Sequence, residues 1–100
     1  MKTKTIFRKF KTGEIIALFP EELGDNKPHL TCLSYMNIGR HSAASVDLVR
    51  ETLPASAREY ADLKKELNRI GYEVEPVKRM RRSFLLVRLS EYKRETGGQS

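Results

Sequence analysis

The sequence predicts one small α+β domain, an antiparallel sheet of four to five strands with one long helix over about residues 57–70 packed on one face. Short alternating apolar runs fill the first 36 residues, and residues 57–70 repeat apolar side chains every three or four positions. After Gly71 the period returns to two. A chain of 100 residues supports one hydrophobic core, which we expect within residues 1–90, followed by a disordered tail over 91–100.

Two strands are predicted near the N-terminus, over residues 5–11 and 14–19, with a tight turn at Thr12 and Gly13 between them. Alternation gives the second strand two apolar faces, with Ile15, Ala17 and Phe19 on one and Ile16 and Leu18 on the other. Such a strand is typical of the centre of a sheet that is covered on both sides. Pro20 ends it, because proline has no N–H to donate to the ladder.

A third strand is predicted over residues 30–36, between a polar loop over 21–29 and a second loop over 37–45. Residues 46–52 fit neither period and predict a short helix or a turn. We expect the strands to share a second apolar face, which consists of Phe7, Ile16, Leu18, Leu33 and Tyr35. Either a homodimer covers that face, or residues 46–52 and 83–92 of the same chain do.

The long helix has predicted ends as well as a predicted face. Ser56 and Glu59 have the spacing of a capping box, in which each side chain accepts a hydrogen bond from the other residue's backbone N–H. Gly71 follows the last apolar residue, where a left-handed residue ends a helix at least steric cost. The apolar stripe consists of Tyr60, Leu63, Leu67 and Ile70. A helix of this length is marginal by itself, so we expect the stripe to pack on the sheet.

The last part of the domain leaves one assignment open. Residues 72–76 alternate and predict a half-buried strand near an edge of the sheet. Residues 83–89 predict another strand if they fold back on the sheet, whereas they form an amphipathic helix if Leu85, Leu89 and Tyr92 make its stripe. The phenylalanine and valine content favours the strand.

Several phrases of the chain resemble those of a family of small uncharacterised bacterial proteins, often carried on plasmids and other mobile elements. They are residues 6–11 (IFRKFK), 13–21 (GEIIALFPE), 33–41 (LSYMNIGRH), 54–55 (PA), 59–64 (EYADLK), 66–67 (EL) and 70–72 (IGY). The resemblance covers about residues 6–79 and implies a bacterial cytosolic protein with no assigned activity. Residues 80–100 lie beyond it.

Catalytic chemistry has few candidate residues in this sequence. Cys32, His29 and His41 are its only cysteine and histidines. A nucleophilic cysteine needs a base nearby, and His41 is the candidate, but the position of Cys32 within a strand favours a buried small apolar side chain. A structural zinc site takes four ligands, usually in paired spacings, so no metal or other cofactor is expected. We find no phosphate-binding glycine loop and no nucleophile elbow, and we predict that the protein is not an enzyme.

The location of the protein is predicted from segments that the sequence lacks. A single cysteine excludes an internal disulfide framework. No apolar region of about 7–15 residues follows the charged N-terminal residues, and no apolar run approaches the ~20 residues that span a bilayer. We therefore expect a cytoplasmic protein without a membrane partner.

The net charge of +6 is unevenly distributed. Residues 1–11 carry five basic side chains and no acidic one, residues 12–75 carry more acidic than basic ones, and residues 76–94 carry seven basic ones and a single glutamate. A nucleic-acid-binding patch is predicted from Arg8, Lys9, Lys11, Lys78, Arg79, Arg81 and Arg82, provided that the two segments are neighbours. The alternative is that these charges protect strand edges and aid solubility.

A weaker anion site is predicted in the loop after the third strand, at Arg40, His41 and Ser42. Its alternative is a solvated turn. Taken together, the sequence favours a binding protein over an enzyme. The leading hypothesis is a mobile-element accessory that contacts nucleic acid non-specifically through its basic ends, with Phe7, Tyr72 or Phe84 stacking on single strands. The second is a protein-interaction or homodimerisation module, and the third is an enzyme that uses Cys32 and His41.

Overall fold

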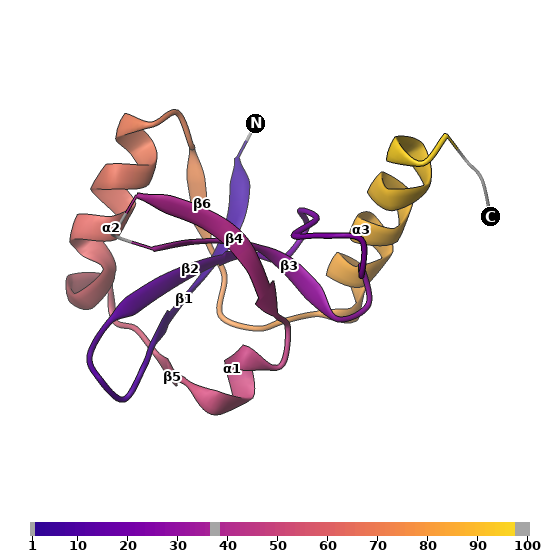
Figure 1. The fold of residues 1–100 in the computed structure, drawn as a ribbon. Coiled ribbons are helices and arrows are strands. Elements are labelled where there is room, and N and C mark those ends of the chain that lie inside the picture. Colours follow the sequence, from indigo (N-terminus) through magenta and orange to yellow (C-terminus); the bar gives the residue numbers. More distant parts are fainter. Residues whose placement is uncertain (1, 37–38, 98–100) are drawn as a thin grey trace.

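The computed structural model describes residues 2–36 and 39–97, and it confirms an α+β architecture. The elements are β1 (Thr3–Lys9), β2 (Ile15–Phe19), β3 (Thr31–Met36), β4 (Arg40–Ser45), α1 (Leu48–Glu51), β5 (Leu53–Pro54), α2 (Ala57–Arg69), β6 (Val74–Pro76) and α3 (Arg82–Glu95). The described sheet thus has six strands, and three helices accompany it rather than one (Figure 1).

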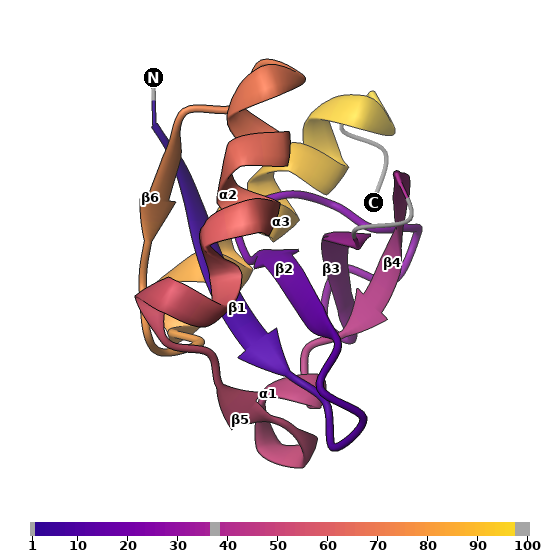
Figure 2. The ribbon, with the colours of Figure 1, turned by 90° about the vertical axis from the view of Figure 1, so that its left-hand side faces the viewer.

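The sheet is antiparallel along the order β4-β3-β2-β1-β5, as the sequence predicts. The exception is β6, which pairs with β1 in parallel over Thr3–Thr5. The chain reaches β6 from β5 through α2, and β5 pairs with β1 in the antiparallel sense, so β5 and β6 run in opposite directions along the same edge of β1. The second half of β1 pairs with β5 at Arg8 and Lys9, so two short strands share the outer edge of β1 (Figure 2).

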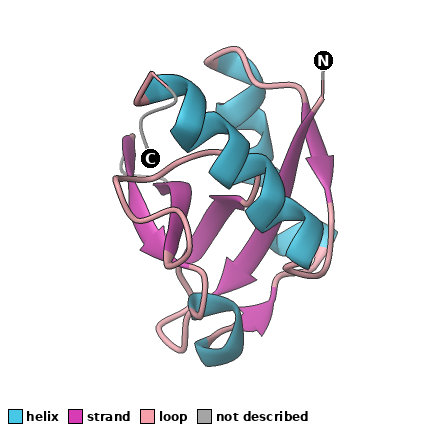
Figure 3. Ribbon diagram, turned by 90° about the vertical axis from the view of Figure 1, so that its right-hand side faces the viewer, coloured by secondary structure: helices cyan, strands magenta, loops and turns pink. Residues whose placement is uncertain are grey.

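The sheet lies between two helical layers, with α2 on one face and α3 on the other (Figures 2 and 3). The α2 face buries Phe7, Ala17, Phe19, Tyr35, Leu63, Leu67 and Val74. The opposite face buries Ile6, Ile16, Leu18 and Cys32, against which α1 and residues 77–80 pack with Leu48, Val49, Val77 and Met80. The alternation predicted for β2 is therefore confirmed, and each of its faces meets its own core.

The predicted second apolar face is wrong in composition. Phe7, Leu33 and Tyr35 lie on the α2 face, whereas Ile16 and Leu18 lie on the other, because pairing of Phe7 with Ala17 sets the register. Residues 46–52 predict a short helix or a turn, and the structure has the helix α1 there, which covers part of the second face. The single apolar face from which we predicted sheet-on-sheet dimerisation is therefore not present.

The α2 helix follows its predicted pattern closely. The capping box of Ser56 and Glu59 is present, and Gly71 adopts a φ of 113° just after the helix. Leu63 and Leu67 are buried and Tyr60 packs on the same core, but Ile70 is 40% exposed. The stripe thus ends one turn earlier than predicted.

Two segments differ from their predicted structure. Residues 83–89 belong to α3, not to a strand, and α3 continues through residues 91–95 of the predicted tail, while residues 98–100 lie outside the described part. The two buried side chains of α3 are Phe84 and Arg88, four positions apart, and the charge of Arg88 hides this helical spacing. The predicted loop over 37–45 contains β4, which pairs with β3 along its whole length. Residues 37–38 lie outside the described residues.

Candidate nucleic-acid interface

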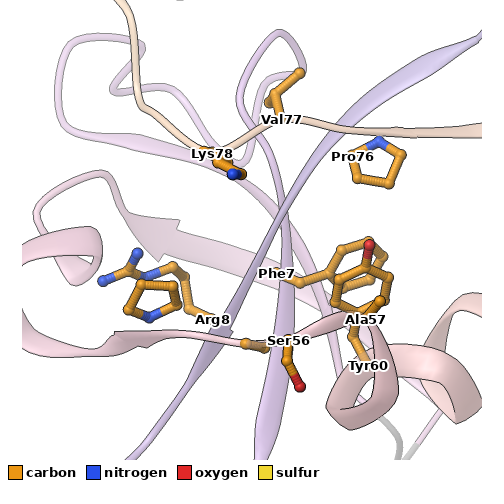
Figure 4. A pocket seen from close by; sticks show the side chains of 10 residues that line it. Phe7, Arg8, Ser56, Ala57, Tyr60, Pro76, Val77 and Lys78 are labelled. Carbon is orange, nitrogen blue, oxygen red and sulfur yellow. The ribbon is translucent and has the colours of Figure 1, made fainter.

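The outer edge of β1 is where the two basic segments of the chain meet. The backbone N–H of Val77 donates to the Thr5 carbonyl at 2.9 Å, and that of Ala55 donates to the Phe7 carbonyl at 3.2 Å. The chain segments that follow β6 and β5 then diverge on either side of this point. A hollow of about 540 Å³ opens between them, and we call it the aromatic hollow (Figure 4).

Apolar and aromatic side chains make most of the aromatic hollow. The rings of Phe7 and Tyr60 stack with centroids 4.0 Å apart and planes 11° apart. The complete lining is Phe7, Arg8, Pro54, Ala55, Ser56, Ala57, Tyr60, Pro76, Val77 and Lys78. This set contains two cations and no carboxylate. Figure 4 shows the stacked rings beside Pro76 at one end, with Lys78 and Arg8 toward the other end.

A second hollow, also of about 540 Å³, shares Arg8 and Lys78 with the first, and we call it the basic hollow. Its other lining residues are Val46, Asp47, Val49, Arg50, Arg79 and Met80. Four basic side chains therefore surround one space with a single carboxylate among them. Such an arrangement favours anions, and guanidinium groups in particular match phosphate oxygens in a two-pronged geometry.

Arg8 also has a structural role that the sequence did not suggest. The side chain is only 8% exposed, and it donates from Nε to Thr52 Oγ1 at 3.0 Å and from Nη2 to the carbonyls of Val49 (2.7 Å) and Thr52. Burial lowers the pKa of the guanidinium from its ordinary value. All three acceptors are neutral, so the positive charge of Arg8 is not cancelled by them. Arg8 thus holds α1 against β1 and adds to the positive potential of the basic hollow.

The structure brings only part of the predicted basic patch together. Lys78 and Arg79 meet Arg8, as predicted, because β6 and β1 are neighbours. Lys9 instead forms an ion pair with Glu59. The remaining three predicted residues, Lys11, Arg81 and Arg82, are exposed and line neither hollow.

Arg50 completes the basic hollow and was missed by sequence reasoning. It lies within the segment from 12 to 75, whose overall charge is acidic, and nothing in that pattern distinguishes it from the other basic residues there. Only the short α1 helix, which Arg8 holds in place, positions Arg50 beside residues 78–79. One sequence signal points toward Arg50, because it lies in residues 46–52, which predict a helix or a turn. In the structure that segment leads into β5, which pairs with β1.

The anion site predicted at Arg40, His41 and Ser42 is not a single cluster. All three residues lie on β4, where successive side chains point to opposite faces. His41 Nε2 lies 2.8 Å from the Tyr72 hydroxyl on the α2 face, whereas the Ser42 hydroxyl lies 3.2 Å from that of Ser34. The two side chains therefore do not face a common ligand.

The two residues of the predicted cysteine site also lie apart. Cys32 is fully buried in the core on the α3 side, whereas His41 is on the α2 side of the sheet. Burial raises the pKa of the Cys32 thiol to about 11, which disfavours the nucleophilic thiolate. Among the described residues no group of three or more His, Cys, Asp or Glu side chains is placed to hold a metal ion. None of the described helices is both long and apolar enough to span a membrane.

Comparison of the chain with protein-family models, with curated proteins and with solved structures finds no match. Membership of the plasmid-borne family therefore stays a prediction. The chemistry of the two hollows is what bears on function.

Proposed function

We propose that the protein binds nucleic acid through the basic hollow, largely without regard to base sequence. The observation that supports this proposal is the convergence of Arg8 from β1, Arg50 from α1, and Lys78 and Arg79 from the segment after β6. Three of these side chains, Arg50, Lys78 and Arg79, are exposed and can reach phosphate oxygens. We extend the proposal to an accessory role on a mobile element, because the family that the chain resembles is often carried on such elements.

The proposal predicts a definite salt dependence. Each phosphate that a Lys or Arg neutralises releases counterions, so log K falls with log salt by roughly 0.7–0.9 per contact. Contacts from the three exposed side chains give a slope of about −2 to −3. The slope is a better measure than affinity alone, because it counts the contacts directly.

The test is an anisotropy titration of a labelled 20-nucleotide single strand, and of the matching duplex, at several salt concentrations. The doubly substituted variant Lys78→Ala/Arg79→Ala is expected to bind about tenfold more weakly at low salt, with a slope reduced by about two contacts. The matched control is Lys65→Ala/Lys93→Ala, which removes the same charge from exposed sites that line neither hollow. Absence of binding at low salt, or equal losses in both variants, would overturn the proposal.

A second candidate function, self-association, is favoured by the free edge of β4. Within residues 2–36 and 39–97 no strand pairs with the side of β4 that faces away from β3. β4 has six residues, no proline, and Arg40 as its only lysine, arginine or carboxylate side chain. On the other side of the sheet, β5 is two residues long and β6 contains Glu75 and Pro76, which are features that discourage edge pairing.

The register of β4 suits pairing with a second copy of itself. Because Val46 N–H donates to the Leu30 carbonyl, the alternation of an antiparallel ladder turns the backbone groups of His41, Ala43 and Ser45 away from β3. Two antiparallel copies of β4 centred on Ala43 place these three residues opposite one another and no like charges face to face. We expect a concentration-dependent dimer by sedimentation that Ala43→Pro abolishes and Ala43→Val retains. A wild-type monomer at high concentration would refute this second function.

A further inference from the structure

We infer that the aromatic hollow holds one base of a single strand whose phosphates lie in the basic hollow. This inference rests on the proposed function and goes further, because it names the form of nucleic acid that the site selects. A base that enters the hollow must leave its stack and its pairing partner. The protein is therefore expected to bind single strands in preference to duplexes.

The first support is the continuity of the two hollows. Arg8 and Lys78 line both of them, so the apolar hollow borders directly on the cationic one. A nucleotide has the same layout, with a flat ring joined through a sugar to an anionic phosphate. An apolar site for another kind of ligand would not need three cationic side chains, Lys78, Arg79 and Arg50, at its border.

The second support is the chemistry of the lining. Aromatic rings bind bases by stacking, and every base has a π-face, so this contact tolerates any sequence. Proline rings and small aliphatic side chains, here Pro54, Pro76 and Ala55, give further flat apolar surface. Polar groups at the rim come from Ser56 and from Tyr60, whose hydroxyl points toward the Pro76 side (Figure 4). The lining has no carboxylate that would repel a phosphate.

The third support is the different burial of the two stacked rings. Phe7 is 5% exposed and belongs to the core, whereas Tyr60 is only partly buried. The core ring therefore fixes the position of Tyr60, and Tyr60 is the aromatic side chain that a base can reach. A preformed ring reduces the entropy that is lost when the strand binds.

The test compares oligonucleotides on the unaltered protein before it uses variants. We expect a single strand of ten thymidines to bind at least about fivefold more tightly than an abasic strand of equal length and charge, because a base stacked on an aromatic ring is worth this much or more. The duplex of equal length is expected to bind like the abasic strand. Free thymidine monophosphate is expected to compete only weakly, since it supplies one phosphate instead of several.

Two substitutions then locate the base. Tyr60→Leu keeps an apolar side chain and is expected to lower single-strand affinity about fivefold or more while leaving duplex binding unchanged. Tyr60→Phe keeps the ring and is expected to retain the affinity of the wild type. As an independent measurement, a strand with 5-iodouracil is expected to cross-link on irradiation to Tyr60 of the wild-type protein, as mapped by mass spectrometry.

The outcomes separate this inference from the proposed function. Equal binding of abasic and normal strands, or a cross-link that maps elsewhere, would overturn the aromatic hollow as the base site and leave nucleic-acid binding intact. Failure of every oligonucleotide to bind at low salt would remove the proposed function and the inference together. Tight binding of the monophosphate without strand binding would also overturn the inference.

Discussion

The two long helices cover opposite faces of the same sheet but are held to it by different forces. α2 is held by apolar and aromatic packing, with Leu63 and Leu67 at 1% and 0% exposure and Tyr60 stacked on Phe7. Its capping box and the ion pair of Glu59 with Lys9 add polar contacts at one end. Each of these features is typical of an amphipathic helix on a sheet.

α3 is held largely by one charged side chain. Arg88 is 2% exposed, and it donates from Nε to the Pro28 carbonyl at 2.9 Å and from Nη1 to the Pro20 carbonyl at 2.5 Å. Burial lowers the pKa of this guanidinium, and Phe84 is the other buried side chain of the helix. Leu86 and Val87, on the other side of the helix, face outward. The difference teaches that hydrogen bonds from one buried arginine to a loop can fix a helix to a sheet in addition to apolar packing.

The largest expected effect tests the packing that holds α2. Leu67→Ala is expected to lower the free energy of unfolding by about 3–5 kcal/mol, because it leaves a cavity in the core between α2 and the sheet. The matched control on α3 is Leu86→Ala, at a side chain that is 58% exposed, with an expected change below about 0.5 kcal/mol. Urea unfolding followed by circular dichroism measures both. Similar losses in the two variants would contradict the contrast between the helices.

A smaller effect is expected when the polar anchor of α3 is removed. Arg88→Met keeps much of the side-chain volume but leaves the carbonyls of Pro20 and Pro28 without their donor, at a cost of about 2–3 kcal/mol. Arg94→Met, at an exposed position of the same helix, is the control.

Labelling of the Cys32 thiol gives a second test of the contact that Arg88 makes. Cys32 lies in the core on the α3 side, so its labelling by a thiol reagent requires that this face open. Arg88→Met is expected to speed the labelling, and Arg94→Met is not. Fast labelling of the wild-type protein would contradict this account and would return Cys32 to consideration as a nucleophile.

The same contrast explains which parts of the fold the sequence predicts. The caps, face and sheet-packing of α2, and the two-faced alternation of β2, depend on side chains close together in the chain, so local pattern was sufficient. For residues 83–89 of α3 the phenylalanine and valine content favours a strand over the alternative helix, because hydrophobic periodicity does not count the charged anchor Arg88. β4 was assigned as a loop because Ser42 and Ala43 have little intrinsic preference for a strand, and pairing with β3 decides the matter.

The candidate site was predictable only in part, for a similar reason. The sequence identifies two basic segments, but it does not reveal that β6 runs parallel beside β1 and so brings Lys78 to Arg8. It also does not show which basic side chains are already paired with a carboxylate, as Lys9 is with Glu59. Arg50 joins the site through α1, a helix of four residues whose position depends on contacts distant in the chain. Long-range pairing, not composition, decides which cations converge.

The smallest expected effect concerns the polar end of α2. The hydrogen bond from Lys9, together with those from the Ser56 backbone and side chain, lowers the pKa of Glu59 from its ordinary 4.5 to about 2. Since the carboxyl binds its proton more weakly in the folded state, its contribution to stability is present above pH 4.5 and is lost as the pH falls toward 2. In the described part of the chain Arg88 fixes α3 through carbonyls and not through a carboxylate, so acid should loosen the contact of α2 first.

The variant that tests this is Glu59→Gln, which can still accept from the Ser56 backbone N–H but does not ionise. We expect its free energy of unfolding, measured in urea between pH 2 and pH 6, to change less with pH than that of the wild type. The control is Glu73→Gln, at an exposed carboxylate before β6 that should leave the wild-type slope in place. If the two variants have the same dependence on pH, the bond between Lys9 and Glu59 does not hold α2 to β1, and packing around Leu63 and Leu67 alone accounts for the attachment of the helix.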